Sequence, residues 1–75
     1  MSVVLYRTDP ARRIHRFYRL DVQRDLFGQW LLIREWGRIG CQGKTLSMPF
    51  ETAGRAEAAL ARHQRRKERR GYAIG

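Results

Sequence analysis

Hydrophobic and polar residues alternate over most of the first two thirds of the chain, which is the period of β-strands that bury one face. The alternation is clearest at residues 15–25, where Tyr18, Leu20 and Val22 fall on one side and polar residues on the other. A shorter apolar run with β-branched residues at 3–7 predicts a preceding strand. The pattern is typical of antiparallel strands with one face against the core and one face towards solvent.

Residues 29–40 form the longest predicted strand, and neither of its faces is purely apolar. One face carries both tryptophans of the chain together with charged residues: Trp30, Leu32, Arg34, Trp36 and Arg38. We therefore expect a bulge or bend that resets the register, for which an interior glycine such as Gly37 is a common position. After a turn at 40–43, residues 44–50 alternate as a fourth strand, and Pro49 marks its end or an edge position.

The period changes to that of a helix after Thr52, which is a natural N-cap. A thin apolar stripe follows at helical spacing: Ala56, Ala59, Leu60 and His63. The opposite face of this helix is basic: Arg55, Arg62, Arg65, Arg66 and Arg69. Gly71 is suited to end the helix. The pattern predicts an α+β fold, a small four- to five-stranded antiparallel sheet with one C-terminal helix packed on one face.

The length of 75 residues predicts a single domain over 1–75 with little room for a deep catalytic cleft. The single cysteine, Cys41, excludes an internal disulfide and offers no zinc-binding spacing. The two histidines lie on different predicted elements, and no carboxylate pair, phosphate-binding glycine loop or metal cluster is evident. We therefore expect no enzyme and no cofactor, metal or small-molecule substrate. The apolar runs are too short for a signal peptide or a membrane span, which favours a cytoplasmic location without a membrane partner.

Charge is the dominant feature of the composition. Sixteen basic residues, of which fourteen are arginine, stand against seven acidic ones, and the formal net charge is +9. A field of this sign attracts polyanions, above all nucleic acid. Because genomic base composition alone can also enrich arginine over lysine, the charge requires support from a second observation.

The tripeptide Trp36-Gly37-Arg38 lies near the end of the third predicted strand and provides that observation. Before it come an aromatic, alternating segment and an aromatic at the start of the tripeptide's own strand: Phe17-Tyr18-x-Leu20-x-Val22 and Trp30. After it come glycines, an early helical alanine and a lysine four residues before Gly-Tyr: Ile39-Gly40, Gly43, Ala56, Lys67 and Gly71-Tyr72. Over about residues 3 to 73 the chain resembles a WGR domain, the module named for this tripeptide.

The resemblance implies a contact with DNA. WGR domains are best known from DNA-damage-activated poly(ADP-ribose) polymerases, in which the tryptophan packs against a nucleotide at a DNA break and the arginine contacts DNA and neighbouring domains. This chain is similar to small free-standing bacterial copies and lacks the catalytic region of the polymerases, so ADP-ribosylation is not implied. His15 stands where many relatives have asparagine, which argues against transferring a contact at this position.

The two tryptophans are assigned different roles. Trp30 is expected in the core. Trp36 shares its face with Arg34 and Arg38, which favours an exposed ring that stacks on a base or sugar, an interaction worth about 1–3 kcal/mol for a base. Arg38 suits a bidentate phosphate contact, which the point charge of lysine reproduces less well.

The remaining candidates have open alternatives. Gly37 permits a bulge, or it leaves a gap beside Trp36 that accepts sugar or phosphate. Lys67 packs its stem under Tyr72 or contacts phosphate. Lys44 and Arg34 are expected at the rim of the site as phosphate contacts.

Two functions follow from these residues. The first is a non-catalytic nucleic-acid-binding module that recognises DNA structure, such as ends or nicks, with DNA favoured over RNA. The second is a protein–protein interaction module that docks an acidic partner through the same tryptophan and arginine surface. Tryptophan and arginine dominate both kinds of contact, so residue type does not separate the two functions, whereas the salt dependence of DNA binding does.

Overall fold

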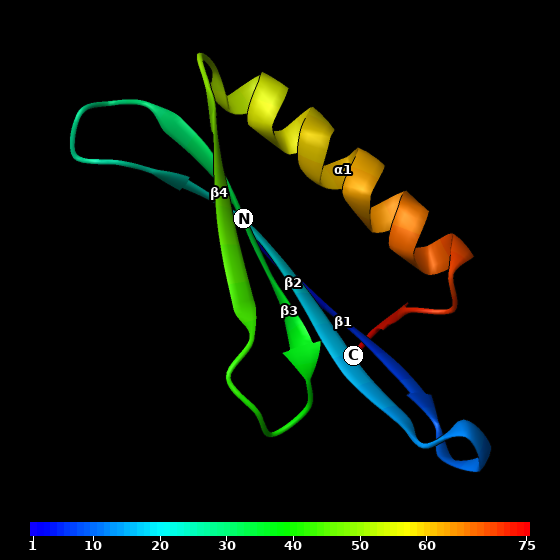
Figure 1. Ribbon diagram of the computed structural model, residues 1–75. Coiled ribbons are helices and arrows are strands. Elements are labelled where there is room, and N and C mark those ends of the chain that lie inside the picture. Colours follow the sequence, from blue (N-terminus) through cyan, green and yellow to red (C-terminus); the bar gives the residue numbers. More distant parts are fainter.

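The computed structural model describes residues 1–75 as one antiparallel sheet with a helix across one face (Figure 1). In chain order the elements are β1 (Ser2–Asp9), the short 3₁₀ helix η1 (Pro10–Arg12), β2 (Ile14–Arg24), β3 (Trp30–Arg38), β4 (Lys44–Phe50), α1 (Ala53–Arg69) and β5 (Ala73–Ile74). The five strands lie in the order β4-β3-β2-β1-β5. This architecture confirms the predicted α+β class, and Pro49 lies on an edge strand as expected.

The register of β3 is unbroken on both sides. It pairs with β2 from Arg38 opposite Arg16 to Trp30 opposite Arg24, and with β4 from Trp36 opposite Lys44 to Trp30 opposite Phe50. The predicted bulge in β3 is therefore wrong, and β2 with 11 residues is longer than β3 with 9. Because α1 covers only part of the sheet face it packs on, charged and apolar residues alternate on that face without any change of register.

The core lies between α1 and the sheet. Eight buried residues form it: Leu5, Tyr18, Leu20, Val22, Leu32, Ala56, Ala59 and Leu60. The alanines lie where the helix meets the strands, and the leucines supply most of the buried apolar surface. Burial of one such leucine contributes about 1.5–3 kcal/mol. The narrow apolar stripe predicted for the helix is therefore sufficient to hold α1 against the sheet.

Both ends of α1 are formed as the sequence predicts. The Thr52 hydroxyl accepts a hydrogen bond from the backbone N–H of Arg55 at 3.1 Å, which satisfies one of the free donors of the first turn. Gly71 follows the last turn with φ of 93°, a left-handed conformation that favours glycine. The chain then turns back, and β5 pairs with β1.

The two tryptophans lie at opposite ends of β3, on the face that carries α1. Both are half-buried, and both pack against the core. Trp30 was predicted in the core but is only partly buried against it, and the predicted contrast with an exposed Trp36 is wrong. The two residues are six positions apart, which is about 20 Å along a strand.

Gly37 faces the other side of the sheet and contacts Gly43 in the loop that follows. A Cβ atom on Gly37 would lie 2.9 Å from the Cα atom of Gly43. A Cβ atom on Gly43 would lie 2.6 Å from the carbonyl oxygen of Trp36 and 2.8 Å from Cζ of Phe17. These distances leave no room for a side chain at either position. The gap that was expected beside Gly37 is therefore filled by the protein itself.

This glycine contact generates a stability prediction. Gly43→Ala should lower the free energy of unfolding by about 1–3 kcal/mol, because the added methyl group meets backbone and a packed ring. The matched change Gly54→Ala lies in the first turn of α1, where a Cβ atom meets nothing within 4 Å. It should raise the free energy of unfolding by about 0.4–1 kcal/mol. Denaturant titration of both variants measures the two effects, and equal effects would contradict the glycine contact.

Candidate nucleic-acid interface

A cavity of about 280 Å³ lies between the C-terminal half of α1 and the sheet at the Trp36 end of β3. We call it the aromatic–basic cavity, after the residues that line it: Tyr18, Arg34, Trp36, His63, Arg66, Lys67 and Arg70. The helical members are spaced by three or four residues, so one face of α1 presents all of them. The strand members come from β2 and β3, the two central strands of the sheet.

Stacked aromatic rings form the strand side of this cavity. Tyr18 and Trp36 are directly opposite in the β2–β3 register, and their ring centroids are 6.0 Å apart with an interplanar angle of 19°. Tyr72 meets the Tyr18 ring edge-on at 6.2 Å. Since Tyr18 is also a buried core residue, the position of Trp36 is fixed by the packing of the whole domain.

The basic groups of the cavity are held by aromatic rings. The guanidinium carbon of Arg34 lies 5.4 Å from the centroid of the Trp36 ring. The Nζ atom of Lys67 lies 4.5 Å from the Tyr18 centroid and 5.5 Å from that of Tyr72. Cation–π contacts of this kind are favourable but leave the hydrogen-bonding capacity of the cation unused.

No carboxylate neutralises these cations. The four ion pairs of the protein lie elsewhere: Arg12–Asp9, Arg19–Asp21, Arg19–Glu35 and Arg55–Glu51. The Nε atom of Arg34 is buried and has no hydrogen-bond partner. A buried donor without a partner costs about 1–3 kcal/mol or more when it is charged. Arg34 Nε is therefore suited to donate to an anionic acceptor in the cavity.

The pKa values of three residues that line the cavity reflect the same excess of positive charge. The pKa of Lys67 is lowered, mainly by burial and then by the positive charges of Arg70, Arg34, Arg66 and Arg16. Burial also lowers the pKa of His63, and the charged neighbours that lower it further are again all cationic: Arg34, Arg66, Arg62 and Lys67. Burial raises the pKa of the Tyr18 phenol, while Arg34 and Arg66 oppose that rise. The arrangement suits a ligand with several negative charges.

A sequence model of the WGR domain matches residues 1–74 of this chain. The chain belongs to the WGR domain family. It is also similar to the uncharacterized protein y4dW of Sinorhizobium fredii (strain NBRC 101917 / NGR234), with 36% identity over 66 residues. That match covers 88% of this chain and 32% of the relative, so the chain spans about a third of the relative's length. No solved structure matches the chain.

WGR domains are in general non-catalytic modules that bind nucleic acid. In this WGR domain no helix is long and apolar enough to cross a membrane.

The structure brings three of the predicted site residues together. Arg34, Trp36 and Lys67 line the aromatic–basic cavity. Arg34 was expected at the rim, but its side chain is half-buried inside the cavity because its stem packs along the sheet while its guanidinium group covers Trp36. Lys44 is exposed on β4, directly opposite Trp36 in the register. The ammonium group of Lys67 lies over the rings of Tyr18 and Tyr72 and lines the cavity, and its contact with phosphate stays a prediction.

The other two residues of the WGR tripeptide lie outside the aromatic–basic cavity. Arg38 pairs with Arg16, two residues along the strands from the Tyr18–Trp36 pair, and it lines a second cavity of about 290 Å³. That cavity is also basic: Arg12, Arg13, Ile14, His15, Arg16 and Arg38. Gly37 faces the opposite side of the sheet, so its packing against Gly43 accounts for the absence of a side chain. A contact of Gly37 with nucleic acid stays a prediction.

Sequence reasoning missed four residues of the cavity: Tyr18, His63, Arg66 and Arg70. Tyr18 was assigned to the core alone, although its ring also lines the site. Arg66 was placed on the solvated face of the helix, but it lines the cavity together with Arg70. The sequence spacing could have placed the helical residues on one face, because they continue that face beyond the apolar stripe: His63, Arg66, Lys67 and Arg70. The two tyrosines and Trp36 could be joined only after the strand register was known.

The lowered pKa of His63 predicts how stability depends on pH. The folded protein favours the neutral imidazole, so the unfolded chain binds the proton more readily. Stability is therefore lost as the pH falls through the ordinary histidine pKa of about 6.5 towards the lower folded value. His63→Gln should make the melting temperature between pH 7.5 and about 5.5 less dependent on pH. His15→Gln, an exposed matched control, should leave the dependence in place. A reversed ranking of the two variants would contradict the role of His63.

Proposed function

We propose that this WGR domain is a DNA-binding module that recognises interrupted duplex, such as ends or nicks, through phosphate contacts and an aromatic contact from Trp36. The observation that carries the proposal is the aromatic–basic cavity, in which cations without carboxylate partners surround a stacked aromatic pair. A site of this composition offers donors to phosphate and a flat ring to a base or sugar.

The phosphate part of the site rests on the free cations. A phosphate in the cavity would give Arg34 Nε the acceptor that it lacks, and it would favour the charged form of Lys67. Arg66 of α1 and Arg70, which directly follows the helix, can share the same phosphate group. Arg38 extends the basic surface along β3 towards the second cavity, and its guanidinium fork suits a bidentate contact with the next phosphate. Lys44 extends the surface onto β4.

The aromatic part of the site supports a preference for interrupted DNA. Tyr18 holds Trp36 in place, so the ring cannot be inserted deeply between stacked base pairs. In an intact duplex every base face is covered, and exposing one costs a few kcal/mol. At an end or a nick much of that cost is absent. A base or sugar at the interruption can then lie against the exposed part of Trp36 while its phosphate enters the cavity.

The phosphate contacts predict a steep dependence on salt. Roughly 3–5 neutralised phosphates should give a slope of about −3 to −4 for the logarithm of the association constant against the logarithm of salt concentration. Lys67→Gln should reduce the magnitude of this slope by about 1. Arg55→Gln is the matched control, because Arg55 lies on the far part of α1 and pairs with Glu51. Fluorescence anisotropy with a labelled duplex measures the slope, and a flat salt response would favour the acidic protein partner instead.

The aromatic contact predicts a preference for nicked or broken DNA over closed circles of roughly ten- to thirty-fold, the scale of one stacking contact. Trp36→Leu should remove this preference but retain the salt-dependent background, whereas Arg38→Gln should weaken binding to all DNA forms. Trp30→Leu is the control, because Trp30 is also half-buried, packs against the same core and lies under an arginine, 5.9 Å from Arg24. The measurement is competition of a labelled nicked duplex against closed circular and linear DNA. Equal competition by closed circles, per base pair, would refute the aromatic contact.

A further inference from the structure

The loop between β2 and β3 lies at one end of the sheet (Figure 1). It precedes Trp30 at the start of β3, so it is at the opposite end of this strand from Trp36, and it exposes two large apolar side chains. Leu26 is 99% exposed and Phe27 is 92% exposed. The other exposed apolar side chains are scattered singly, which is normal for a protein surface. An adjacent leucine and phenylalanine without cover are characteristic of an interaction site.

This loop is fixed by its own hydrogen bonds. The Asp25 carboxylate accepts hydrogen bonds from the backbone N–H groups of Phe27 at 2.9 Å and Gln29 at 2.8 Å. The backbone N–H of Asp25 donates to the carbonyl oxygen of Gln29 at 2.9 Å, and Gly28 adopts φ of 85°. The loop therefore presents Leu26 and Phe27 in a defined geometry, which lowers the entropic cost of binding a partner.

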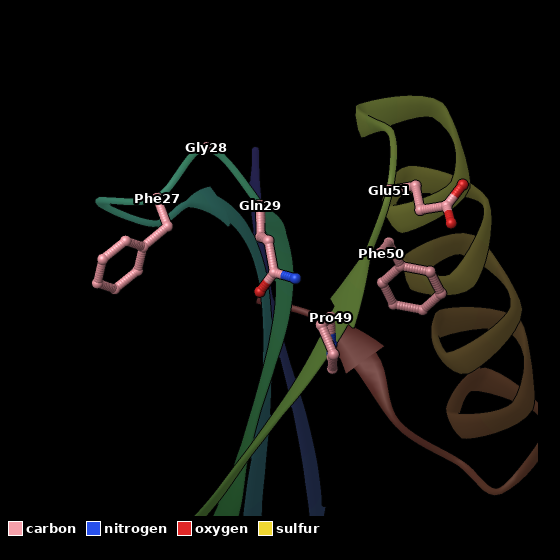
Figure 2. Close-up of a pocket in the computed structure, with 6 residues that line it drawn as sticks. All are labelled: Phe27, Gly28, Gln29, Pro49, Phe50 and Glu51. Atoms are coloured by element: carbon pink, nitrogen blue, oxygen red, sulfur yellow. The ribbon is translucent and has the colours of Figure 1, made fainter.

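A cavity of about 390 Å³ lies next to the same loop, between it and the end of β4 (Figure 2). The residues that line it are Phe27, Gly28, Gln29, Pro49, Phe50 and Glu51. Its volume is in the range of sites that accept small organic molecules, so it can accept a large apolar side chain. In the view of Figure 2, Phe27 and Phe50 point away from each other, with Gln29 and Pro49 between them. The exposed side chains and the cavity are thus immediate neighbours.

The charge at this end favours a second copy of this chain as the partner. The segments that form it, residues 24–30 and 49–57, contain two basic and three acidic residues: Arg24, Arg55, Asp25, Glu51 and Glu57. Their net charge is −1, so the rest of the chain, with fourteen basic and four acidic residues, carries +10. Two copies of this chain repel each other over most of their surface. The end that carries Leu26 and Phe27 lacks this excess of positive charge, so two copies can approach through it without that repulsion.

We propose that the β2–β3 loop is a self-association surface, through which two copies of this chain form a two-fold symmetric dimer. Phe27 and Leu26 of each copy pack into the cavity beside the loop of the other copy. Because the side chains and the cavity are adjacent, one two-fold axis satisfies both contacts at once. The contact is smaller than the roughly 1,200–2,000 Å² of a standard stable interface, so the dimer is weak and forms with increasing concentration.

The dimer places the two basic ends far from each other. Each aromatic–basic cavity lies about 20 Å along β3 from the dimer contact, on the outward side. Nucleic-acid binding and self-association therefore use separate surfaces. The inference does not depend on the proposed function, and its test contains no DNA.

Sedimentation equilibrium between about 10 µM and about 1 mM tests the proposal, since small interfaces dissociate in this range. The average mass should rise from monomer towards dimer with concentration. Higher salt should strengthen the association, because it screens repulsion between two strongly basic copies. DNA binding has the opposite salt dependence, so the two activities are distinguishable in the same protein.

Matched variants locate the contact. Phe27→Ser and Leu26→Ser should each raise the dimer dissociation constant by roughly tenfold or more, because each change removes a buried apolar side chain from both copies. Both residues are exposed in the monomer, so the melting temperature of the dilute protein should not change. Leu46→Ser is the control, because Leu46 is a 46% exposed leucine on the β4 edge outside the loop and its cavity. A monomer throughout the concentration and salt range, or association lost in Leu46→Ser and kept in Phe27→Ser, would overturn the proposal.

Discussion

The stacking of Tyr18 on Trp36 is the contact on which the rest of this WGR domain depends. Tyr18 belongs to the core, and its ring also meets Tyr72 and the ammonium group of Lys67. One side chain therefore joins the two central strands, the end of α1 and the segment that leads into β5. The core and the candidate site are built from the same aromatic rings. A ligand in the cavity contacts groups that the domain has already immobilised, so little conformational entropy is lost on binding.

The basic cavity shows how a marginal fold can maintain an unfavourable charge cluster. Arg34, Arg66, Lys67 and Arg70 repel each other and have no carboxylate nearby. Aromatic rings contact two of these cations, Arg34 and Lys67. Burial of the four core leucines contributes folding free energy that offsets the repulsion within the cluster. Functional sites are commonly regions where a protein sacrifices stability. In this domain the repelling cations are concentrated in the cavity between the C-terminal half of α1 and the sheet.

Much of the fold could be predicted from the sequence because each element has a local signal. The alternation of apolar and polar residues predicted the strands, and Thr52 and Gly71 predicted the ends of the helix. The site was predicted less completely. The bulge in β3 was inferred on the assumption that a strand has one wholly apolar face, which fails where the helix covers only part of the sheet. Trp36 was expected to be exposed because arginines flank it, yet a long arginine stem allows half-burial. Its stacking on Tyr18 depends on strand register, which no single segment encodes.

The contact between Gly37 and Gly43 has a consequence for the edge of the sheet. β4 has a hydrogen-bonded neighbour on one side only, and a shift of one residue would turn Phe50 and Met48 from the helix side to the opposite face. Gly43 directly precedes this strand and fits against the Trp36 carbonyl and Gly37 only in the observed alignment. The contact between these two glycines thus fixes the register of the edge strand. We therefore expect insertions and deletions to be tolerated at the exposed positions 40–42, but not between Gly43 and Lys44, the first residue of β4.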